Sequence, residues 1–450
     1  MKKAIVQSVL VVLLVCGAAS SVLADTHYAA QNGQTPSGTF TDWNSAASNI
    51  QDAVGQAANN DTVLIGAGHY TTTNGSVYGT STNVVMISIA ALTLSSSNGN
   101  PASVSIDGGG NKRGILLHSA GSATIPVVIN GITISNCFIS GANGGGIESD
   151  KTSGTQLVQN CVICDNITTW GGGGVDNTGG SAFMIISNCV VRHNQAGAGS
   201  LGGGIYGAQF VTDCLIESNS AGFGAGIGSG STFQNCTIRY NSSSSKGGGI
   251  YNLNGARTII VRNCLIYNNT ATTGGGLCGM PGGNTYSPLV LVQNCTIVSN
   301  NAGANKGGGI GGSWTTGGST TASNLIFQIE NSIIRSNNSA SALDLVLATT
   351  NGNSQYLSHT INNTCFYPTN LTSVAWVGSG NTTNDPRFVN FAGQDFHLQS
   401  PSPCINTGTN QDWMIGAKDI DGNPRKDRVS GIVDMGCYEL PSRGTLFIIR

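Results

Sequence analysis

The feature that most constrains this chain is an internal repeat built on Asn-Cys or Asp-Cys. Ile or Val stands two residues after each cysteine, and Asn stands five residues after it in all copies but the first. The copies recur every 22 to 31 residues, and most are followed by a glycine run closed by an aliphatic residue, as in NCTIVSNNAGANKGGGI. The repeated cysteines are Cys137, Cys161, Cys189, Cys214, Cys236, Cys264 and Cys295, and a degenerate eighth copy begins at Asn331.

Apolar residues two apart in a repeat of this length predict a parallel β-helix. Side chains alternate between the faces of a strand, so each cysteine and the following Ile share one face. A strand of three or four residues cannot bury that face alone, so coils must stack about 4.8 Å apart with like residues over like. We therefore expect an interior column of cysteines, asparagine ladders at the turns, and glycine corners where the backbone needs a positive φ.

Composition excludes several other classes of protein. Glycine supplies 65 of the 450 residues, and each glycine in a helix costs about 1 kcal/mol relative to alanine. There are only 11 prolines and no collagen period, and a net charge of −2 offers no basic surface for nucleic acid. Leucine-rich repeats and propeller blades fit the residue pattern and the spacing less well. The sequence thus predicts an all-β solenoid that binds no nucleic acid.

Residues 1–24 have the pattern of an export signal. Two lysines precede an apolar run at 4–16, and the small-residue segment that ends at Ala24 fits a signal-peptidase site. We expect cleavage before Asp25 and export through a Sec signal, with no transmembrane segment in the mature chain. The predicted location is extracellular, on a bacterial cell surface, or periplasmic.

Twelve cysteines lie beyond Cys16, which falls in the predicted signal and whose preceding residue does not suit a lipobox. Export favours disulfides, whereas the stacked column favours buried free thiols, and we predict that most of the cysteines are free. A disulfide between Cys404 and Cys437 stays open as an alternative. Cys161 and Cys164 form a C-x-x-C, but no second pair of ligands accompanies them, so no zinc or redox site is predicted.

The ends of the chain differ in pattern from the repeat. Residues 42–60 place apolar side chains near helical spacing and predict an amphipathic helix that caps the first coil, followed by a strand at 62–65. The repeat fades after residue 338, and the last part of the chain carries more charge, proline and aromatic residues. We expect a signal peptide at 1–24, a β-helix with its N-terminal cap at 25–384 with clear repeats at 130–338, and a C-terminal cap region at 385–450.

The mature chain resembles the pectate-lyase-like superfamily of right-handed parallel β-helix proteins. Its opening, HYAAQNGQTPSGTFTDWNSAASNIQDAVGQAANNDTVLIGAGHY, has that superfamily's order of strand, capping helix and first coil strand. Its ending, with DIDGNPR and VDMGCYEL, is similar to secreted bacterial proteins of the choice-of-anchor Q type. The I-x-x-N-x-A and GGGI segments are similar to repeats of polymorphic outer-membrane protein passengers, which are surface adhesins. The resemblance implies a right-handed, single-stranded β-helix, but no Asp-Asp pair of polygalacturonases and no Arg-x-Pro-x-x-Arg of pectate lyases is present, so no catalytic residue is assigned.

The candidate site is a stripe at the third and fourth positions after the cysteines. The third position should point outward, so that adjacent coils present one side chain about every 4.8 Å. Arginines would bind carboxylates and tyrosines would stack on sugar rings, which suits an acidic or neutral glycan. The alternative is a solvated face with an ion-pair ladder of two arginines and a glutamate. The candidate ligand-binding residues are Arg192, His193, Glu217, Arg239, Tyr240 and Tyr267.

The C-terminal part of the chain holds one candidate calcium site. Asp419 and Asp421 in D-x-D-G-N resemble the start of a calcium loop, but Ser430 stands where such a loop needs its final glutamate. A turn is favoured there, so no cofactor is expected, with Ca²⁺ as the alternative.

Two functions follow from these features. The first is a non-catalytic glycan-binding or adhesin-like protein, exported as a monomer, whose partner is an extracellular polysaccharide or a host- or cell-surface glycan. The second is a polysaccharide lyase or glycoside hydrolase acting in a groove on the β-helix face, which insertions at 277–291 and 310–325 would wall. The few carboxylates and the repeat made of packing residues favour the first.

Overall fold

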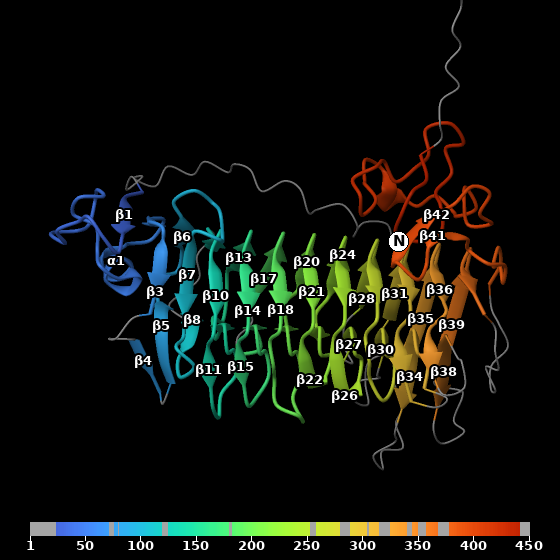
Figure 1. Ribbon diagram of the computed structural model, residues 1–450, viewed down its shortest axis with the longest axis horizontal. Coiled ribbons are helices and arrows are strands. Elements are labelled where there is room, and N and C mark those ends of the chain that lie inside the picture. Colours follow the sequence, from blue (N-terminus) through green and yellow to red (C-terminus); the bar gives the residue numbers. More distant parts are fainter. Residues whose placement is uncertain are drawn as a thin grey trace, which may run out of the picture.

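The chain winds as a solenoid in which three long sheets of 12, 11 and 11 strands run side by side along the molecule (Figure 1). Neighbouring strands of each sheet come from successive coils and pair in parallel, apart from one antiparallel pair at an edge. The right-handed parallel β-helix expected from the sequence is confirmed. This computed structural model describes residues 24–71, 76–79, 81–118, 125–179, 182–252, 258–279, 289–303, 306–314, 325–339, 344–349, 357–367 and 378–441, so the predicted signal and most of both predicted groove walls lie outside it.

Each full coil gives one strand to each long sheet. Sheet A consists of β1 (Thr26–Ala29), β2 (Thr62–Ile65), β6 (Thr93–Ser96), β9 (Val127–Asn130), β13 (Thr155–Gln159), β17 (Phe183–Ser187), β20 (Phe210–Thr212), β24 (Thr232–Gln234), β28 (Ile259–Arg262), β31 (Leu289–Gln293), β35 (Leu325–Glu330) and β39 (Leu357–Asn362). Sheet B consists of β3 (Gly68–Tyr70), β7 (Val104–Asp107), β10 (Thr133–Ser135), β14 (Val162–Cys164), β18 (Val190–Arg192), β21 (Leu215–Glu217), β25 (Thr237–Arg239), β29 (Leu265–Tyr267), β32 (Thr296–Val298), β36 (Ile333–Arg335) and β40 (Cys365–Phe366). Sheet C consists of β4 (Ser76–Tyr78), β5 (Ser81–Ile87), β8 (Arg113–Leu117), β12 (Ile147–Ser149), β16 (Val175–Asp176), β19 (Ile205–Tyr206), β23 (Ile227–Gly228), β27 (Ile250–Asn252), β30 (Leu277–Gly279), β34 (Ile310–Trp314) and β38 (Leu345–Thr349).

Shorter elements connect or flank these sheets. The described residues also form one α-helix, one 3₁₀ helix, three parallel strand pairs at the corner between sheets B and C, and one antiparallel hairpin. These are α1 (Ile50–Gln56), η2 (Asp412–Met414), β11 (Phe138–Ile139) with β15 (Ile167–Thr168), β22 (Ser220–Phe223) with β26 (Ser242–Lys246), β33 (Asn301–Ala302) with β37 (Asn338–Ser339), and the hairpin β41 (Phe388–Asn390) with β42 (Asp395–Leu398).

The three corners of a repeat coil each use a residue with left-handed backbone. In the coil of Cys161 these residues are Asn160, Asp165 and Gly172, with φ of 55°, 57° and 68°. Glycine adopts this conformation without strain, and Asn and Asp adopt it more readily than other residues do. The Asn or Asp before each cysteine is therefore a corner residue. The fourth residue after each cysteine is also a corner residue, a role that the repeat pattern alone does not reveal.

The interior of the solenoid is the column of cysteines and aliphatic residues that the repeat predicts. Cys161 and Ile163 are buried, and their counterparts in the other repeats are buried as well. All twelve cysteines of the described residues are free, which confirms the prediction for most of them. The alternative disulfide is absent, because Cys404 packs beside Cys365 while Cys437 packs in a separate cluster with Tyr267.

A ladder of buried asparagine side chains fixes the corner that follows sheet B. From the second rung on, each amide oxygen accepts hydrogen bonds from the backbone N–H and the side-chain amide of the previous rung, as Asn219 Oδ1 does from Asn194 at 3.0 Å each. Each amide nitrogen also donates to an interior carbonyl, as Asn194 Nδ2 does to Ile163 at 2.9 Å. The predicted amide ladder is thus confirmed, and its rungs are Asn166, Asn194, Asn219, Asn241, Asn269, Asn300 and Asn337.

The N-terminal helix is shorter than predicted. It begins after Asn49, whose side chain accepts a hydrogen bond from the backbone N–H of Asp52 and so caps the first turn. Trp43 lies outside the helix and packs edge-on against Tyr28 with 4.6 Å between ring centroids. The apolar spacing that suggested a helix over 42–60 therefore comes from two structures, a bent segment and then α1, which contacts β1, β2 and β5.

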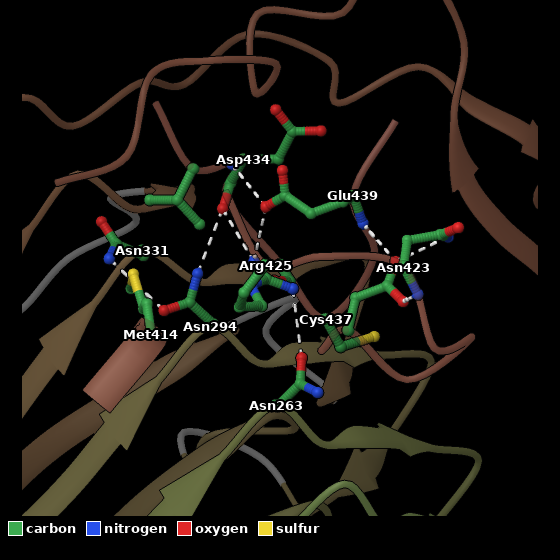
Figure 2. Close-up of polar contacts among 12 residues, drawn as sticks. Asn263, Asn294, Asn331, Met414, Asn423, Arg425, Asp434, Cys437 and Glu439 are labelled. Carbon is green, nitrogen blue, oxygen red and sulfur yellow. Dashed lines mark hydrogen bonds and ion pairs between the residues drawn. The ribbon is translucent and has the colours of Figure 1, made fainter. Parts of the chain in front are cut away.

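The C-terminal segment, residues 385–441, folds back beside the last coils instead of only closing their end (Figure 1). Four corner asparagines donate their side-chain amides to backbone carbonyls of this segment. At the centre of the contact, the buried Arg425 donates to Asn263 Oδ1 at 3.1 Å and to the carbonyls of Asp434 and Gly436 at 3.1 and 2.9 Å (Figure 2). The four asparagine contacts run from Asn263 to Lys418, Asn294 to Asp434, Asn331 to Thr409 and Asn363 to Thr407, at 2.9 to 3.1 Å.

Candidate functional site

The predicted stripe does form on the outer face of sheet B. Arg192 of β18 pairs in register with Glu217 of β21, which pairs with Arg239 of β25, and Arg239 in turn with Tyr267 of β29. Arg239 forms an ion pair with Glu217 at 2.7 Å and donates to the Tyr267 hydroxyl at 2.7 Å. Within the described ranges Arg192 has no ion pair with Glu217, so the predicted ladder of charges is formed at only one of its two steps.

One end of this stripe is covered. Tyr267 is buried because Phe396 of the C-terminal segment packs on it, with 5.3 Å between ring centroids. Tyr240 is exposed at a corner, but its hydroxyl donates to Gln394 of the same segment at 2.7 Å. The residues point outward as expected, but the C-terminal segment covers this end, which the spacing of the repeat does not show.

The other end of the stripe is open. Arg192 is exposed, and His193 lies at the adjacent corner with its ring 3.5 Å from the carboxylate of Asp165. The side chains of His193 and Asp165 are 53% and 60% exposed, so this contact is a surface ion pair. Arg192 and His193, two of the six predicted residues, thus remain accessible away from the C-terminal segment. They could give a ligand little more than a charged contact.

The aspartates considered for calcium serve the C-terminal segment itself. Asp419 is buried, and its carboxylate accepts hydrogen bonds from the backbone N–H groups of Asp421, Asn423 and Glu439 at 2.7 to 3.0 Å. Asp421 instead contacts the Nε2 atom of His397 at 2.6 Å. The favoured turn is what the structure contains, and no group of three or more His, Cys, Asp or Glu residues in the described part of the chain could hold a metal ion.

A second polar column lies on the outer face of sheet C, where sequence reasoning placed no site. Glu148 of β12 pairs in register with Asp176 of β16, and Asp176 with Tyr206 of β19. Their strand neighbours Ile147 and Val175 point inward and are fully buried. Adjacent strands lie about 4.8 Å apart, so the column sets two carboxyl groups and a phenol side by side.

Arg113 anchors the first carboxylate of this column. Its guanidinium forms an ion pair with Glu148 and donates to Asn83 Oδ1 at 2.7 Å and to the carbonyls of Gly144 and Asn143 at 2.9 Å. The Arg113 side chain is 2% exposed, while that of Glu148 is 17% exposed. Burial raises the pKa of Glu148 even though the arginine opposes that shift. Glu148 is thus a fixed carboxyl group that still reaches the surface.

Asp176 is the least ordinary carboxyl group in the column. Its Oδ1 accepts hydrogen bonds from the backbone N–H and the hydroxyl of Thr178 at 2.9 and 2.6 Å, but its Oδ2 is buried without a hydrogen-bond partner. Burial raises the pKa of Asp176 to about 7, and the charge of Glu148 adds to the shift. Since buried polar atoms are nearly always bonded, such an atom beside a second carboxyl group marks a place where chemistry or binding is favoured.

Aromatic side chains stand beside this column. Trp170 is 54% exposed at the glycine corner that leads into β16. The next residue, Gly171, lies so close to the ring of Tyr206 that a Cβ there would be 2.7 Å from it. Trp170 is thus an exposed indole that directly precedes a glycine packed on the Tyr206 ring, and proteins use such aromatic rings together with carboxyl groups to stack on and hydrogen-bond to sugars. We call Arg113, Glu148, Trp170, Asp176 and Tyr206 the sheet C site.

Comparison with solved structures yields a match described as the crystal structure of pectate lyase Pel9A. The two superpose with a TM-score of 0.53 at 11% sequence identity, over 93% of this chain and 97% of that chain. The likeness is one of fold. No family model matches the chain, and no curated protein sequence matches it. No described helix is long and apolar enough to cross a bilayer.

The sheet C site could have been found from the sequence by one further step. The aliphatic residue that closes each glycine run points inward, so the residue after it must point outward on the same strand. That position holds Glu148, Asp176, Tyr206 and Tyr251 in four of the coils, whereas other coils have glycine or cysteine there.

Chemically, the sheet C site combines a partly exposed carboxyl group with a buried one on the next strand. Carboxyl pairs about 5 to 9 Å apart carry out acid–base catalysis on glycosidic bonds, and a spacing of one strand is at the lower end of that range. An acid whose pKa is near 7 can give and take a proton at neutral pH. The arrangement is therefore suited to holding a sugar and to moving a proton beside it.

Proposed function

We propose that this chain is an exported, monomeric protein of the cell surface or its surroundings that binds a polysaccharide along the outer face of sheet C. The observation that carries the proposal is the exposed Trp170 at the corner that leads into the outward column of Glu148, Asp176 and Tyr206. A parallel β-helix presents one side chain per coil at a spacing of about 4.8 Å, which is close to the length of a sugar unit, so an extended chain can follow the column. The adhesin-like function expected from the sequence is one form of this proposal.

The test is a binding assay with soluble acidic and neutral polysaccharides, measured by calorimetry. Trp170→Ala should weaken binding about tenfold, because it removes the ring that stacks on a sugar. Trp43→Ala is the matched control, since Trp43 is 42% exposed at the N-terminal end of the molecule, and it should leave affinity unchanged. If no polysaccharide binds, or if both variants bind as the parent does, the proposed surface is wrong.

A second function, cleavage of the bound polysaccharide, is favoured by the unpartnered oxygen of Asp176. In this scheme the carboxyl group of Glu148, which reaches the surface, contacts the glycan. The buried carboxyl group of Asp176 on the next strand exchanges a proton with Glu148. The same polysaccharides should then release unsaturated or reducing sugars, with or without added Ca²⁺. Asp176→Asn should abolish release while binding persists, because the amide keeps the shape but loses the acid. Binding with no release in the parent protein would leave recognition as the function.

A further inference from the structure

The buried carboxylate of Asp61 ties together the N-terminal cap, which consists of β1, α1 and the turn into β2 (Figure 1). Asp61 is 4% exposed. Its Oδ2 accepts the backbone N–H of Ala58, just after α1, at 2.7 Å and lies 3.1 Å from Nε2 of the buried His27 in β1. Its Oδ1 accepts the backbone N–H of Asp25 at 2.8 Å. One oxygen of a buried carboxylate thus faces the nitrogen atom of Asp25.

This carboxylate is charged but has no lysine or arginine beside it. Burial opposes the charge, yet the hydrogen bonds from Ala58, Asp25 and His27 prevail and lower the pKa of Asp61. Among the described residues its ion-pair partner is His27 alone, and a histidine is charged only when it is protonated. A buried carboxylate is stabilised by a cation within hydrogen-bond reach. The site therefore favours a cation at Oδ1, where the uncleaved chain places a neutral N–H.

The nitrogen atom of Asp25 is held at this oxygen by the strand that follows it. The Asp25 carbonyl accepts the backbone N–H of Thr62 at 2.9 Å, and Thr26 pairs in register with Thr62. Ala24 and Asp25 are exposed, so loss of Ala24 removes no buried side chain. The position of the nitrogen is thus set by β1 and β2 and not by the residues before it.

Cleavage before Asp25, which the pattern of residues 1–24 predicts, changes the chemistry of this nitrogen. Water adds its hydroxyl to the carbonyl carbon of Ala24 as the bond to the Asp25 nitrogen breaks. The remaining water proton and the proton that the Ala24 carboxyl group releases go to the nitrogen, which becomes an ammonium group. A neutral amide with one donor is thereby replaced by a cation with three donors at the same place.

We propose that Asp61 is the binding site for the new α-ammonium group of Asp25, and that this ion pair fixes the N-terminal cap once residues 1–24 are removed. Charge-assisted hydrogen bonds are roughly twice as strong as neutral ones, so processing strengthens a contact that already has the right geometry. A firmly held cap keeps the first edge of sheet A from pairing with other chains. The proposal rests on the proposed export of the chain and is independent of polysaccharide binding.

The test compares two chains that differ in their first residue, one starting at Asp25 and one at Ala24. Both have the same formal charge, but in the second the Asp25 nitrogen remains a neutral amide. Amide hydrogen exchange should give protection factors in β1 and β2 that are about tenfold higher in the chain starting at Asp25. Its α-amine should also react about tenfold more slowly with an acylating reagent at pH 7, because a paired ammonium group holds its proton. Mass spectrometry of the exported protein should give Asp25 as the first residue.

Asp61→Asn assigns these effects to the carboxylate, because the amide keeps an oxygen acceptor and loses the charge. Both differences between the two chains should disappear in this variant. The control is Asp52→Asn, which removes an exposed carboxylate from α1 and should leave both differences as they are. The comparison of the two parent chains needs no substitution, so it stands even if Asp61→Asn loosens the cap.

The proposal is overturned if the two parent chains behave alike, if their differences survive Asp61→Asn, or if the exported protein starts at another residue. None of these measurements uses a polysaccharide, so a failure of the proposed recognition is seen separately from a failure at Asp61.

Discussion

Asp176 links the stability of the fold to pH. Its pKa is raised to about 7 in the fold by burial, against about 3.9 for an unfolded Asp. Between these pH values the folded chain keeps a proton that the unfolded chain has lost, so stability falls as pH rises from about 4 to about 7. The expected loss is on the order of 4 kcal/mol. Urea unfolding at pH 5 and pH 8 should show about two thirds of this fall in the parent protein, since the unfolded Asp is already ionised at pH 5, and a much smaller fall in Asp176→Asn.

A matched control for this prediction is Asp165→Asn. Asp165 has a 60% exposed side chain, and its replacement should leave the pH dependence of unfolding as it is in the parent. If Asp176→Asn and the parent lose the same stability between pH 5 and pH 8, then Asp176 is ionised in the fold, and its role as a proton donor is excluded. If Asp176→Asn is more stable than the parent at pH 8, then Asp176 lowers the stability of the fold at that pH, as residues of functional sites commonly do.

Single residues also show how far the sequence predicts this molecule. The inward positions of Cys161 and Ile163 follow from alternation along a strand, which is a local rule, and they were predicted. The burial of Tyr267 was not, because it depends on Phe396, more than a hundred residues away in a segment without repeats. Repeats predict what stacks on what, since each coil contacts its neighbours, but they carry no signal about a non-repeating segment that packs across several coils.

At the scale of the element, the asparagine ladder should be the most sensitive part of the solenoid. Asn241 Oδ1 accepts two bonds from Asn219, and Asn241 Nδ2 donates to Ile216 and Asn269. Asn241→Ala leaves these buried groups unbonded, at about 1 to 3 kcal/mol for each group. We expect the free energy of unfolding in urea to fall by about 3 kcal/mol or more.

The control for the ladder is the same substitution at an exposed asparagine. Asn384→Ala should change the free energy of unfolding by less than about 0.5 kcal/mol, since surface changes are usually that small. A similar small effect for Asn241→Ala would mean that water or neighbouring groups replace the lost bonds, and that packing of the cysteine column alone holds the coils in register.

At the scale of the whole molecule, the C-terminal segment is held in its own fold by groups that titrate. His397 bridges Asp395 and Asp421, with its ring nitrogens 2.5 and 2.6 Å from their carboxylate oxygens. Burial opposes the charge of the imidazole, but the two aspartates prevail and raise the pKa of His397. Burial raises the pKa of Glu439 to about 8. Both folded-state pKa values lie above the unfolded ones, so both contributions are complete at low pH and are lost as pH rises.

The segment should therefore loosen on the alkaline side before the solenoid does. The contribution of Glu439 is lost from about pH 4.3 up to about pH 8, and that of His397 is lost from about pH 6.5 upward. Amide hydrogen exchange in residues 385–441 should therefore speed up relative to the intrinsic rate as pH rises to 9, while the sheet strands stay protected. His397→Gln should make the segment exchange faster already at pH 6, since the charged bridge is gone. The control variant His193→Gln, at an exposed corner with one aspartate, should not have this effect.

Tyr267 lies beneath this segment. If Tyr267 becomes exposed over the same pH range, undocking of the segment uncovers the end of the sheet B stripe. Equal exchange at pH 6 and pH 9 would show that the four asparagine contacts and the buried arginine hold the segment without help from these protons.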